Sequence, residues 1–342
     1  MMKEKEEQHL EWLQQHQTTE PHLGLERVRR LLALRGNPHL QVSVIHVAGT
    51  NGKGSTIAHL RQLLQAKKLR VGTFTSPYLM SYNEQIAING VSISDQDFHS
   101  LLQTYQGLLK KQADDTILQE ITEFEIITVL AYEYFLQQQV DVVIMEVGLG
   151  GLLDSTNVCQ PDLTAITTIG LDHTAILGTS LADIAEQKAG IFKAGKKAVI
   201  AKLSSEARLV CQKKADSLAV DLYQAGQDFS MLNGDFSSSL LNLSQLKIGL
   251  EGAYQQENAA LALPAFLLFM REGKEAVDEQ VVRQALEKTH WAGRLERIRP
   301  QIYLDGAHNL PALTRLVEFI KEKEQEGYRP QILFGALKRK DY

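Results

Sequence analysis

The stretch His46-Val47-Ala48-Gly49-Thr50-Asn51-Gly52-Lys53-Gly54-Ser55 decides the fold of this chain. Apolar, mostly β-branched residues from position 42 onward lead into it, and an apolar pattern with helical spacing, residues 57–67, follows it. A strand, a glycine-rich turn with one lysine and a helix form a grip for a polyphosphate, because the turn N–H groups, the helix N-terminus and the lysine all present positive charge to one place. The stretch therefore predicts an α/β domain that binds a nucleotide.

This loop departs from the usual GxxxxGK[ST] pattern at two positions. Val47 stands where the pattern has its first glycine, and Gly54 stands where it has the hydroxyl residue that binds magnesium. If magnesium binds here with ATP, the metal must take a hydroxyl from elsewhere in the chain. Ser76, at the end of the next predicted strand, is the nearest candidate, and Ser55 competes with it, although we expect Ser55 to bind phosphate.

Composition excludes several classes of protein. The 342 residues suggest about two domains, and 44% hydrophobic with 23% charged residues is typical of a soluble globular protein. A net charge of −5 argues against nucleic-acid binding, and the two cysteines provide neither a disulfide framework nor a zinc site. The sequence has no signal-peptide core and no apolar run near the ~20 residues of a membrane span, so we expect a cytoplasmic protein without a membrane segment.

Strand and helix patterns alternate through the first two thirds of the chain. This alternation predicts an α/β fold with a doubly wound, mostly parallel sheet, whose ligands gather at the carboxyl ends of the strands. A hairpin is predicted around Asn89-Gly90. The predicted strands are residues 70–75, 140–147, 163–169 and 198–201, and the predicted helices are residues 23–34, 94 onward, 124–138, 181–192 and 205–218.

A second, smaller domain is predicted at the C-terminal end. Short β segments from residue 228 and helices at 257–270 and 277–288 precede an apparent boundary at 294–299. A new βαβ unit then follows, with strand 302–304, helix 310–323 and strand 332–334. We therefore expect a P-loop domain at 1–296 and the start of a Rossmann-like α/β domain at 297–342. Because roughly 45 residues are too few to bury a core, we expect this domain to be incomplete and turnover by residues 1–342 alone to be weak or absent.

Several polar residues follow the predicted strands where a ligand would bind. Glu146 ends an apolar strand next to glycines, which is the usual place for a magnesium-binding carboxylate. His173 follows the next strand and could be a ligand, a base or a solvated histidine. Lys188 lies on a predicted helix, where most lysines are solvated. In the C-terminal unit, Asn309 is placed to cap a helix that has Pro311 in its first turn.

Taken together, these motifs resemble the folylpolyglutamate synthase/dihydrofolate synthase family of Mur-ligase-like, ATP-dependent amide ligases. No single motif decides the resemblance; their order and spacing do, over almost the whole chain. Four positions depart from the family pattern: Tyr78 in place of a histidine, Leu152 in place of a common arginine, Tyr254 where His-Gln is common, and Ala292 in place of a frequent proline. The motifs that carry the resemblance are 49–55, 75–77, 122–125, 146–151 with Asp154 and 156–157, 172–174, 188–191, 293–296 and 305–309.

The resemblance implies a role for each motif. It implies two Mg²⁺ ions beside ATP, with Lys188 carried as an N-carboxylated (carbamate) side chain near the second metal. The catalytic residues would be Lys53, Glu146, His173 and Lys188, and the metal ligands would be Ser76, Glu146 and His173. The ATP-binding residues would be Asn51, Gly52, Lys53, Gly54 and Ser55 for the phosphates, Asn258 for the adenine, and Arg294, Asp305 and His308 from the hinge and the C-terminal domain. The pterin substrate would contact Thr122, Glu123, Phe124, Glu125 and Asp154.

The implied reaction joins L-glutamate to the γ-carboxyl group of a reduced folate through an acyl phosphate. The same motifs would serve dihydropteroate as the acceptor, so the sequence leaves both activities open. The partners are then small molecules only, and the family implies a monomer. The alternatives are a Mur-type peptidoglycan amino-acid ligase, which Gly54 and Ser76 disfavour, a nucleotide-binding switch or phosphotransferase, and a non-catalytic nucleotide-binding fragment.

Overall fold

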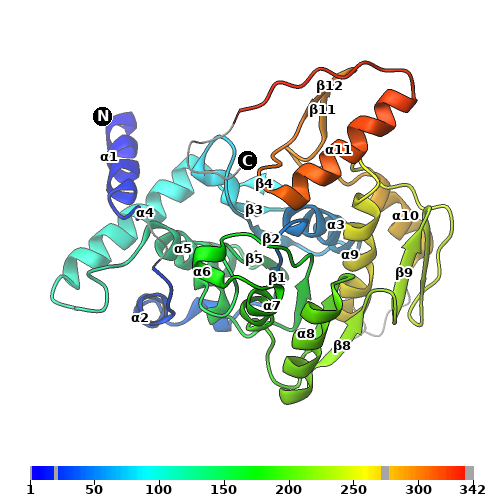
Figure 1. The fold of residues 1–342 in the computed structure, drawn as a ribbon. Helices are drawn as coiled ribbons and strands as arrows, with labels where there is room; N and C mark the ends of the chain where they lie inside the picture. The colour runs from blue at the N-terminus through cyan, green and yellow to red at the C-terminus, as the bar shows by residue number, and fades with distance from the viewer. Residues whose placement is uncertain (1, 19–21, 271–276, 336–342) are drawn as a thin grey trace.

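The computed structural model describes residues 2–18, 22–270 and 277–335, and an eight-stranded sheet lies at its centre (Figure 1). The strand order is β4-β3-β2-β5-β1-β6-β7-β8. β3 pairs antiparallel with both β2 and β4, and the remaining neighbours pair in parallel. The predicted doubly wound, mostly parallel sheet is therefore confirmed. The strands are β1 Val44–Ala48, β2 Val71–Phe74, β3 Ile86–Ile88, β4 Val91–Ser92, β5 Val142–Glu146, β6 Leu163–Ile166, β7 Lys197–Ile200 and β8 Asp221–Gln224.

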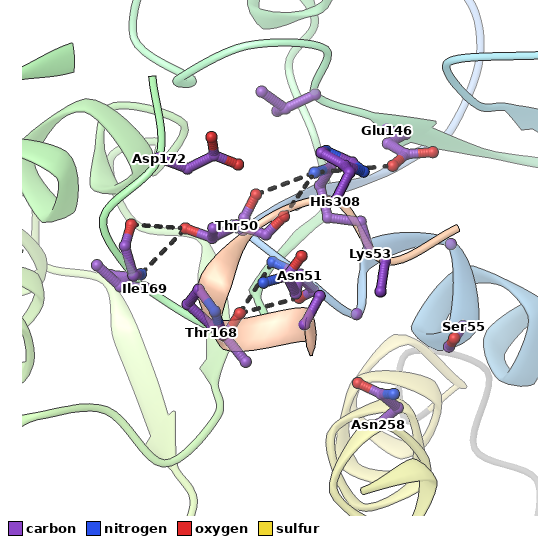
Figure 2. A pocket seen from close by; sticks show the side chains of 18 of the residues that line it. Thr50, Asn51, Lys53, Ser55, Glu146, Thr168, Ile169, Asp172, Asn258 and His308 are labelled. Atoms are coloured by element: carbon purple, nitrogen blue, oxygen red, sulfur yellow. Dashed lines mark hydrogen bonds and ion pairs between the residues drawn. The ribbon is translucent and has the colours of Figure 1, made fainter. Parts of the chain in front are cut away.

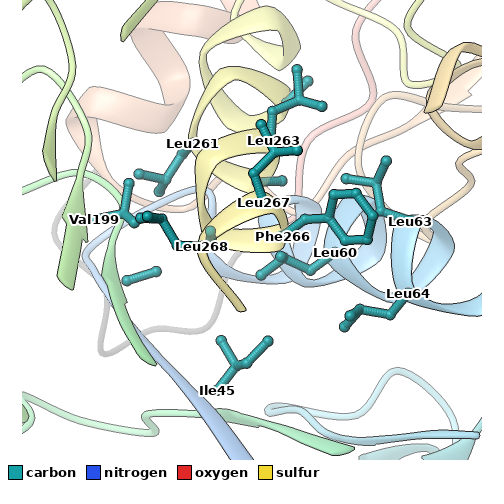
Figure 3. Close-up of a cluster of buried hydrophobic side chains, with 14 of the residues drawn as sticks. Ile45, Leu60, Leu63, Leu64, Val199, Leu261, Leu263, Phe266, Leu267 and Leu268 are labelled. Atoms are coloured by element: carbon teal, nitrogen blue, oxygen red, sulfur yellow. The ribbon is translucent and has the colours of Figure 1, made fainter. Parts of the chain in front are cut away.

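Helices cover both faces of this sheet, which explains why its central strands are almost wholly apolar. Successive side chains of β1 point to opposite faces, so Ile45 packs with α3 and α9, as Figure 3 shows, whereas Val44 packs on the side of α2 and α5. The helices are α1 Met2–Gln14, α2 Glu26–Leu34, α3 Lys53–Ala66, α4 Asp95–Lys111, α5 Glu123–Gln137, α6 Thr174–Leu177, α7 Leu181–Ala189, α8 Ser205–Ser217, α9 Gln255–Met270, α10 Glu279–Glu287 and α11 Leu310–Gln325.

Short elements complete the description. Within residues 2–18, 22–270 and 277–335, three 3₁₀ turns occur in loops and two hairpins lie outside the main sheet. The turns are η1 Pro38–Leu40, η2 Tyr82–Gln85 and η3 Ser155–Val158, and the hairpin strands are β9 Phe229–Leu232 with β10 Asp235–Ser238, and β11 Glu296–Arg299 with β12 Ile302–Leu304. Among the described residues, no helix combines the length and the apolar content that a bilayer span requires.

The C-terminal unit differs from the prediction. β12 pairs in an antiparallel hairpin with β11, and no second parallel strand forms at residues 332–334, where Ile332 is 68% exposed. The predicted βαβ unit is therefore wrong for the described residues, since an apolar run forms a strand only where a partner strand meets it. β11 also spans the expected domain boundary at residues 296 and 297.

Candidate active site

A pocket with a volume of about 360 Å³ lies where the loops after β1, β2, β5 and β6 meet α9 and the start of α11. Figure 2 shows Asn51, Lys53, Glu146, Asp172 and His308 around it. This is the carboxyl edge of the sheet, where a doubly wound fold binds its ligands. All the residues predicted for catalysis, ATP and metal line this one pocket: Asn51, Gly52, Lys53, Gly54, Ser55, Ser76, Glu146, His173, Lys188, Asn258, Arg294, Asp305 and His308.

The phosphate loop connects β1 to α3 and is closely packed against its neighbours. Gly52 has a φ of 85°, and a Cβ atom there would lie 2.4 Å from Oδ1 of Asn258. Glycine is therefore needed at this position for both its left-handed backbone and its lack of a side chain. Lys53 Nζ donates to the carbonyl oxygens of Gly49 and Thr50 at 3.0 and 3.3 Å, so its charge is held at the centre of the loop.

Gly54 lies against the indole ring of Trp291. A Cβ atom at Gly54 would lie 2.7 Å from Nε1 of Trp291 and 3.0 Å from its Cε2. A serine or threonine at this position, as in the usual loop pattern, therefore cannot be accommodated unless the ring moves. The missing hydroxyl of the loop thus has a packing cause that is not visible in the sequence motif.

Replacing Gly54 with serine will weaken nucleotide binding by roughly tenfold, because overpacking of about 1–3 kcal/mol forces the Trp291 ring or the loop to shift. Isothermal calorimetry with a non-hydrolysable ATP analogue measures this change. The Trp291→Ala substitution in the Gly54→Ser background removes the clash and will restore part of the affinity. Equal affinity of Gly54→Ser and the unchanged protein would contradict this account of the loop.

The three candidate metal ligands, Ser76, Glu146 and His173, line the same pocket as the loop. Glu146 is buried at the end of β5, and its Oε2 accepts a hydrogen bond from the Ser76 backbone N–H at 3.2 Å. Its Oε1 lies 3.9 Å from Lys53 Nζ; burial raises the pKa of Glu146, and the charge of Lys53 opposes that rise. His173 begins α6 in a left-handed backbone conformation with a φ of 49°.

The donor set in this pocket suits Mg²⁺ only in part. Among the described residues, no three His, Cys, Asp or Glu side chains converge as a ready metal site. A carboxylate, a hydroxyl and an imidazole are present in the same pocket. This set fits a magnesium ion that keeps several waters and takes phosphate oxygens from its nucleotide, as Mg²⁺ commonly does.

Lys188 departs from the usual environment of a helical lysine. Lys188 lies on α7 and is 3% exposed. Burial, together with the nearby charge of Lys53, lowers the pKa of its amine to about 7. An amine with this pKa is about half neutral at pH 7. Lys188 thus has a far larger neutral, reactive fraction at pH 7 than a solvated lysine has.

The C-terminal unit closes one side of the pocket by direct contacts with the phosphate loop. Asn309 caps α11 and forms a reciprocal amide pair with Asn51, with N···O distances of 3.0 and 3.1 Å. Its Nδ2 also donates to Oδ2 of Asp172 at 3.0 Å. Nη2 of Arg315 donates to both carboxylate oxygens of Glu257, at 2.9 and 3.2 Å, and this ion pair links α11 to α9. The loop and α11 are therefore held in one arrangement.

A second pocket, with a volume of about 520 Å³, adjoins the first. The two share Ser76, Pro77, Gly148 and Leu149. Of the residues predicted to bind the pterin, Thr122, Glu123, Phe124 and Asp154 line this second pocket.

The structure does not bring Glu125 into either pocket. The Glu125 carboxylate accepts from the Thr122 backbone N–H at 2.8 Å, which completes the capping box of α5, and it pairs with Arg27 at 3.0 Å. Glutamate at this position of a helix is a capping signal that the sequence already contains. The described contacts of Glu125 are thus those of a helix-stabilising residue.

Sequence reasoning missed the N-terminal wall of the second pocket. Gln17 lies on this wall, and its Nε2 donates to the Tyr82 hydroxyl at 2.9 Å and to Oε1 of Glu123 at 3.2 Å. His16 and His22 lie on the same wall. No motif marks these residues in the sequence, because their place depends on how the segment after α1 packs against α5.

Known proteins similar to this chain belong to the family that its motifs resemble. Residues 47–266 match the Mur ligase middle domain family. The chain is 39% identical over 336 residues to a dihydrofolate synthase/folylpolyglutamate synthase of Bacillus subtilis, covering 93% of this chain and 76% of that protein. It is 36% identical to a folylpolyglutamate synthase of Lacticaseibacillus casei, with 92% and 76% covered. A solved complex of a folylpolyglutamate synthase (FPGS) with AMPPCP and folate superposes on this chain with a TM-score of 0.86. The two are 34% identical, and the match covers 93% of this chain and 80% of that chain.

Proposed function

The chain belongs to the folylpolyglutamate synthase/dihydrofolate synthase family of ATP-dependent ligases, and we propose that it joins L-glutamate to the γ-carboxyl group of a reduced folate. The observation that carries this proposal is the junction of the two pockets at Ser76-Pro77 and Gly148-Leu149. A folate bound in the second pocket can extend its glutamate tail through this junction toward the terminal phosphate of ATP in the first. Dihydropteroate can occupy the same pocket, which supports dihydrofolate synthase as a second activity.

The main task of the first pocket is to bring two anions together. The substrate carboxylate must attack the γ-phosphate, and at about 4 Å and an effective dielectric of about 20 two like unit charges repel by about 4 kcal/mol. Lys53 lines this pocket with the rest of the loop, and its charge, with the N–H groups at the start of α3, would offset this repulsion. Two Mg²⁺ ions, held by Ser76, Glu146 and His173 together with phosphate oxygens, would supply further positive charge.

The resulting acyl phosphate is the electrophile that the amine of glutamate attacks, and inorganic phosphate leaves. The protein contributes position more than covalent chemistry to this step. In our assignment Asn258 contacts the adenine, while Arg294, Asp305 and His308 reach the nucleotide from the C-terminal side. The contacts between Asn309 and Asn51 support this assignment, because they hold that side against the phosphate loop.

We also propose that Lys188 carries a carbamate. Carboxylation needs the neutral amine, which costs about 4–5 kcal/mol at pH 7 for a lysine with a reference pKa of ~10.4. With the pKa of Lys188 lowered to about 7, this cost falls below about 1 kcal/mol. The carbamate would replace a buried cationic group beside Lys53 with an anionic metal ligand.

The remaining assignments follow the family resemblance. We propose a nucleotide- and folate-binding domain at 1–296, a C-terminal domain that begins at 297, and a monomer in the cytoplasm. The two cysteines, Cys159 and Cys211, are buried and unpaired, which supports a reducing compartment. In the second pocket, Thr122, Glu123, Phe124 and Asp154 are our candidates for contact with the pterin ring.

The test is ADP release by the enzyme with tetrahydrofolate or dihydropteroate, each with and without L-glutamate. We expect release to require both the pterin substrate and glutamate. Release with dihydropteroate as well as with tetrahydrofolate would establish both activities. ATP turnover that is independent of folate would contradict the proposal, and turnover with a peptidoglycan precursor would favour the Mur-type alternative.

A further inference from the structure

Four buried polar side chains form a hydrogen-bonded chain from the protein core to the second pocket. Cys159 Sγ lies 3.6 Å from His46 Nδ1, and His46 Nε2 lies 2.8 Å from Thr156 Oγ1. Thr156 Oγ1 lies 2.5 Å from Oδ1 of Asp154, which lines the second pocket. All four residues are at most 4% exposed, so no bulk water competes with these contacts.

Two parts of the fold, β1 and η3, hold this hydrogen-bonded chain of side chains. His46 lies in the middle of β1 and points to the side of the sheet that α5 covers. The other three residues belong to η3 and its two ends, with Asp154 as N-cap and Cys159 as C-cap. The Tyr132 hydroxyl of α5 donates to the Thr156 carbonyl oxygen at 3.2 Å and fixes η3 against the helix. The geometry of this hydrogen-bonded chain is therefore set by β1, η3 and α5.

The protons in this chain can be assigned from its two ends. Burial lowers the pKa of His46 to about 3, so its ring is neutral and has one donor and one acceptor nitrogen. At the other end, Asp154 accepts hydrogen bonds from two backbone N–H groups, those of Thr156 at 3.0 Å and Leu149 at 2.8 Å. Backbone N–H groups can only donate, so both carboxylate oxygens accept. Burial raises the pKa of Asp154, and the hydrogen bonds from Thr156 and Leu149 oppose that rise and favour the ionised, accepting form.

The direction of the remaining hydrogen bonds follows. Since Asp154 accepts, the Thr156 hydroxyl gives its proton to Oδ1 and has a lone pair left for His46. His46 must then donate from Nε2, which leaves Nδ1 to accept from the Cys159 thiol. Each proton thus points toward Asp154, and the three side-chain hydrogen bonds are oriented in the same direction, which strengthens each of them.

We propose that His46 and Thr156 are positioning residues that hold Asp154 as an ionised hydrogen-bond acceptor for an N–H group of the heterocyclic ring bound in the second pocket. The chemistry of the ligand rests on the proposed function, since a pterin ring presents such N–H groups. The direction of the hydrogen bonds does not rest on the proposed function, because it follows from the protein alone. The chain explains why a histidine is placed in the middle of a core strand, where it costs hydrophobic packing.

The first test is the tautomer of His46 in the unchanged protein. Nuclear magnetic resonance of enzyme labelled with ¹⁵N in its histidine rings distinguishes a protonated Nε2 from a protonated Nδ1, and the spectrum of His46→Gln assigns the signal. We expect the neutral Nε2–H tautomer, unchanged between about pH 5 and about pH 8. A His46 ring protonated at Nδ1, or one that titrates in this range, overturns the inference.

The second test separates positioning from folding. Thr156→Val removes the hydroxyl at nearly constant volume, and Thr156→Ser keeps it as the matched control. For Thr156→Val we expect the KM for the folate and its dissociation constant to rise about tenfold, the loss of a charge-assisted hydrogen bond, with the KM for ATP changed by less than about twofold. Thr156→Ser will restore the folate values, and His46 will lose its single tautomer only in the valine variant.

Two outcomes are distinguishable. If Thr156→Val lowers thermal stability but leaves folate binding unchanged, the chain is only structural and the inference is wrong. If the unchanged enzyme shows no folate-dependent ADP release and binds no folate, the proposed function is wrong, and the His46 tautomer still decides whether the chain points toward Asp154.

Discussion

Replacing Lys53 with alanine will lower kcat/KM for ATP by about a thousandfold or more, which is the largest effect we expect at this site. Lys53 Nζ is held by two loop carbonyls and lies 3.9 Å from Glu146, so its charge faces the place where negative charge accumulates. Its loss also acts on Lys188, because the charge of Lys53 helps to lower the pKa of that amine. Steady-state ADP release measures the change.

Two variants make the Lys53 experiment specific. Lys110→Ala removes an exposed lysine at the end of α4, outside both pockets, and will leave kcat/KM unchanged. Lys53→Arg keeps the charge, but the planar guanidinium is wider than an ammonium and will not restore the rate. Near-normal turnover by Lys53→Ala would show that the loop N–H groups alone hold the phosphates and would contradict our assignment of Lys53.

Replacing Lys188 with alanine will lower kcat by about a hundredfold or more while the KM for folate changes little. The predicted carbamate is a charged group next to the reacting phosphate, and a metal ligand of this kind acts on the chemical step more than on binding. A short carboxylate such as acetate, added to the variant, will restore part of the rate because it can enter the space that the side chain leaves.

The acidity of Lys188 adds a pH dependence with a defined sign. Because burial lowers the pKa of the amine to about 7, the neutral form that accepts CO₂ predominates above about pH 7, and its fraction falls about tenfold for each pH unit below that. Enzyme depleted of CO₂ will therefore regain activity with bicarbonate to a several-fold greater extent at about pH 8 than at about pH 6. Labelling with ¹³C-bicarbonate followed by nuclear magnetic resonance detects the carbamate directly. Full activity of Lys188→Ala, or no bicarbonate response, would refute the modification.

The phosphate loop and the central sheet could be predicted because their signals are local. Glycines that need a special backbone, a lysine in the turn and continuous apolar strands each leave a mark within a few residues. The edge strand β8 was missed because its residues are partly exposed and mostly polar. The helix α1 was missed because it is charged and lacks a wide apolar face.

Features that depend on distant partners could not be predicted. The antiparallel pairing of β11 with β12, the N-terminal wall of the second pocket and the contact of Asn309 with Asn51 all join segments whose meeting no local pattern records. Glu125 shows the converse case, because its sequence motif is real but its described contacts are those of a helix cap. The motif located the second pocket, and only packing showed which of its residues face it.

The ring that lies against Gly54 has one more consequence. The chain contains two tryptophans, and Trp12, on α1, packs against a separate hydrophobic cluster that includes Leu13 and Phe98. A Trp12→Phe protein would therefore keep a single indole, with its Nε1 directly beside the first turn of α3. Phosphates arriving at that turn bring negative charge close to the indole, and the emission of such a ring depends on the field around it. The packing that excludes a hydroxyl from the loop thus also equips the protein with an intrinsic optical reporter of its nucleotide.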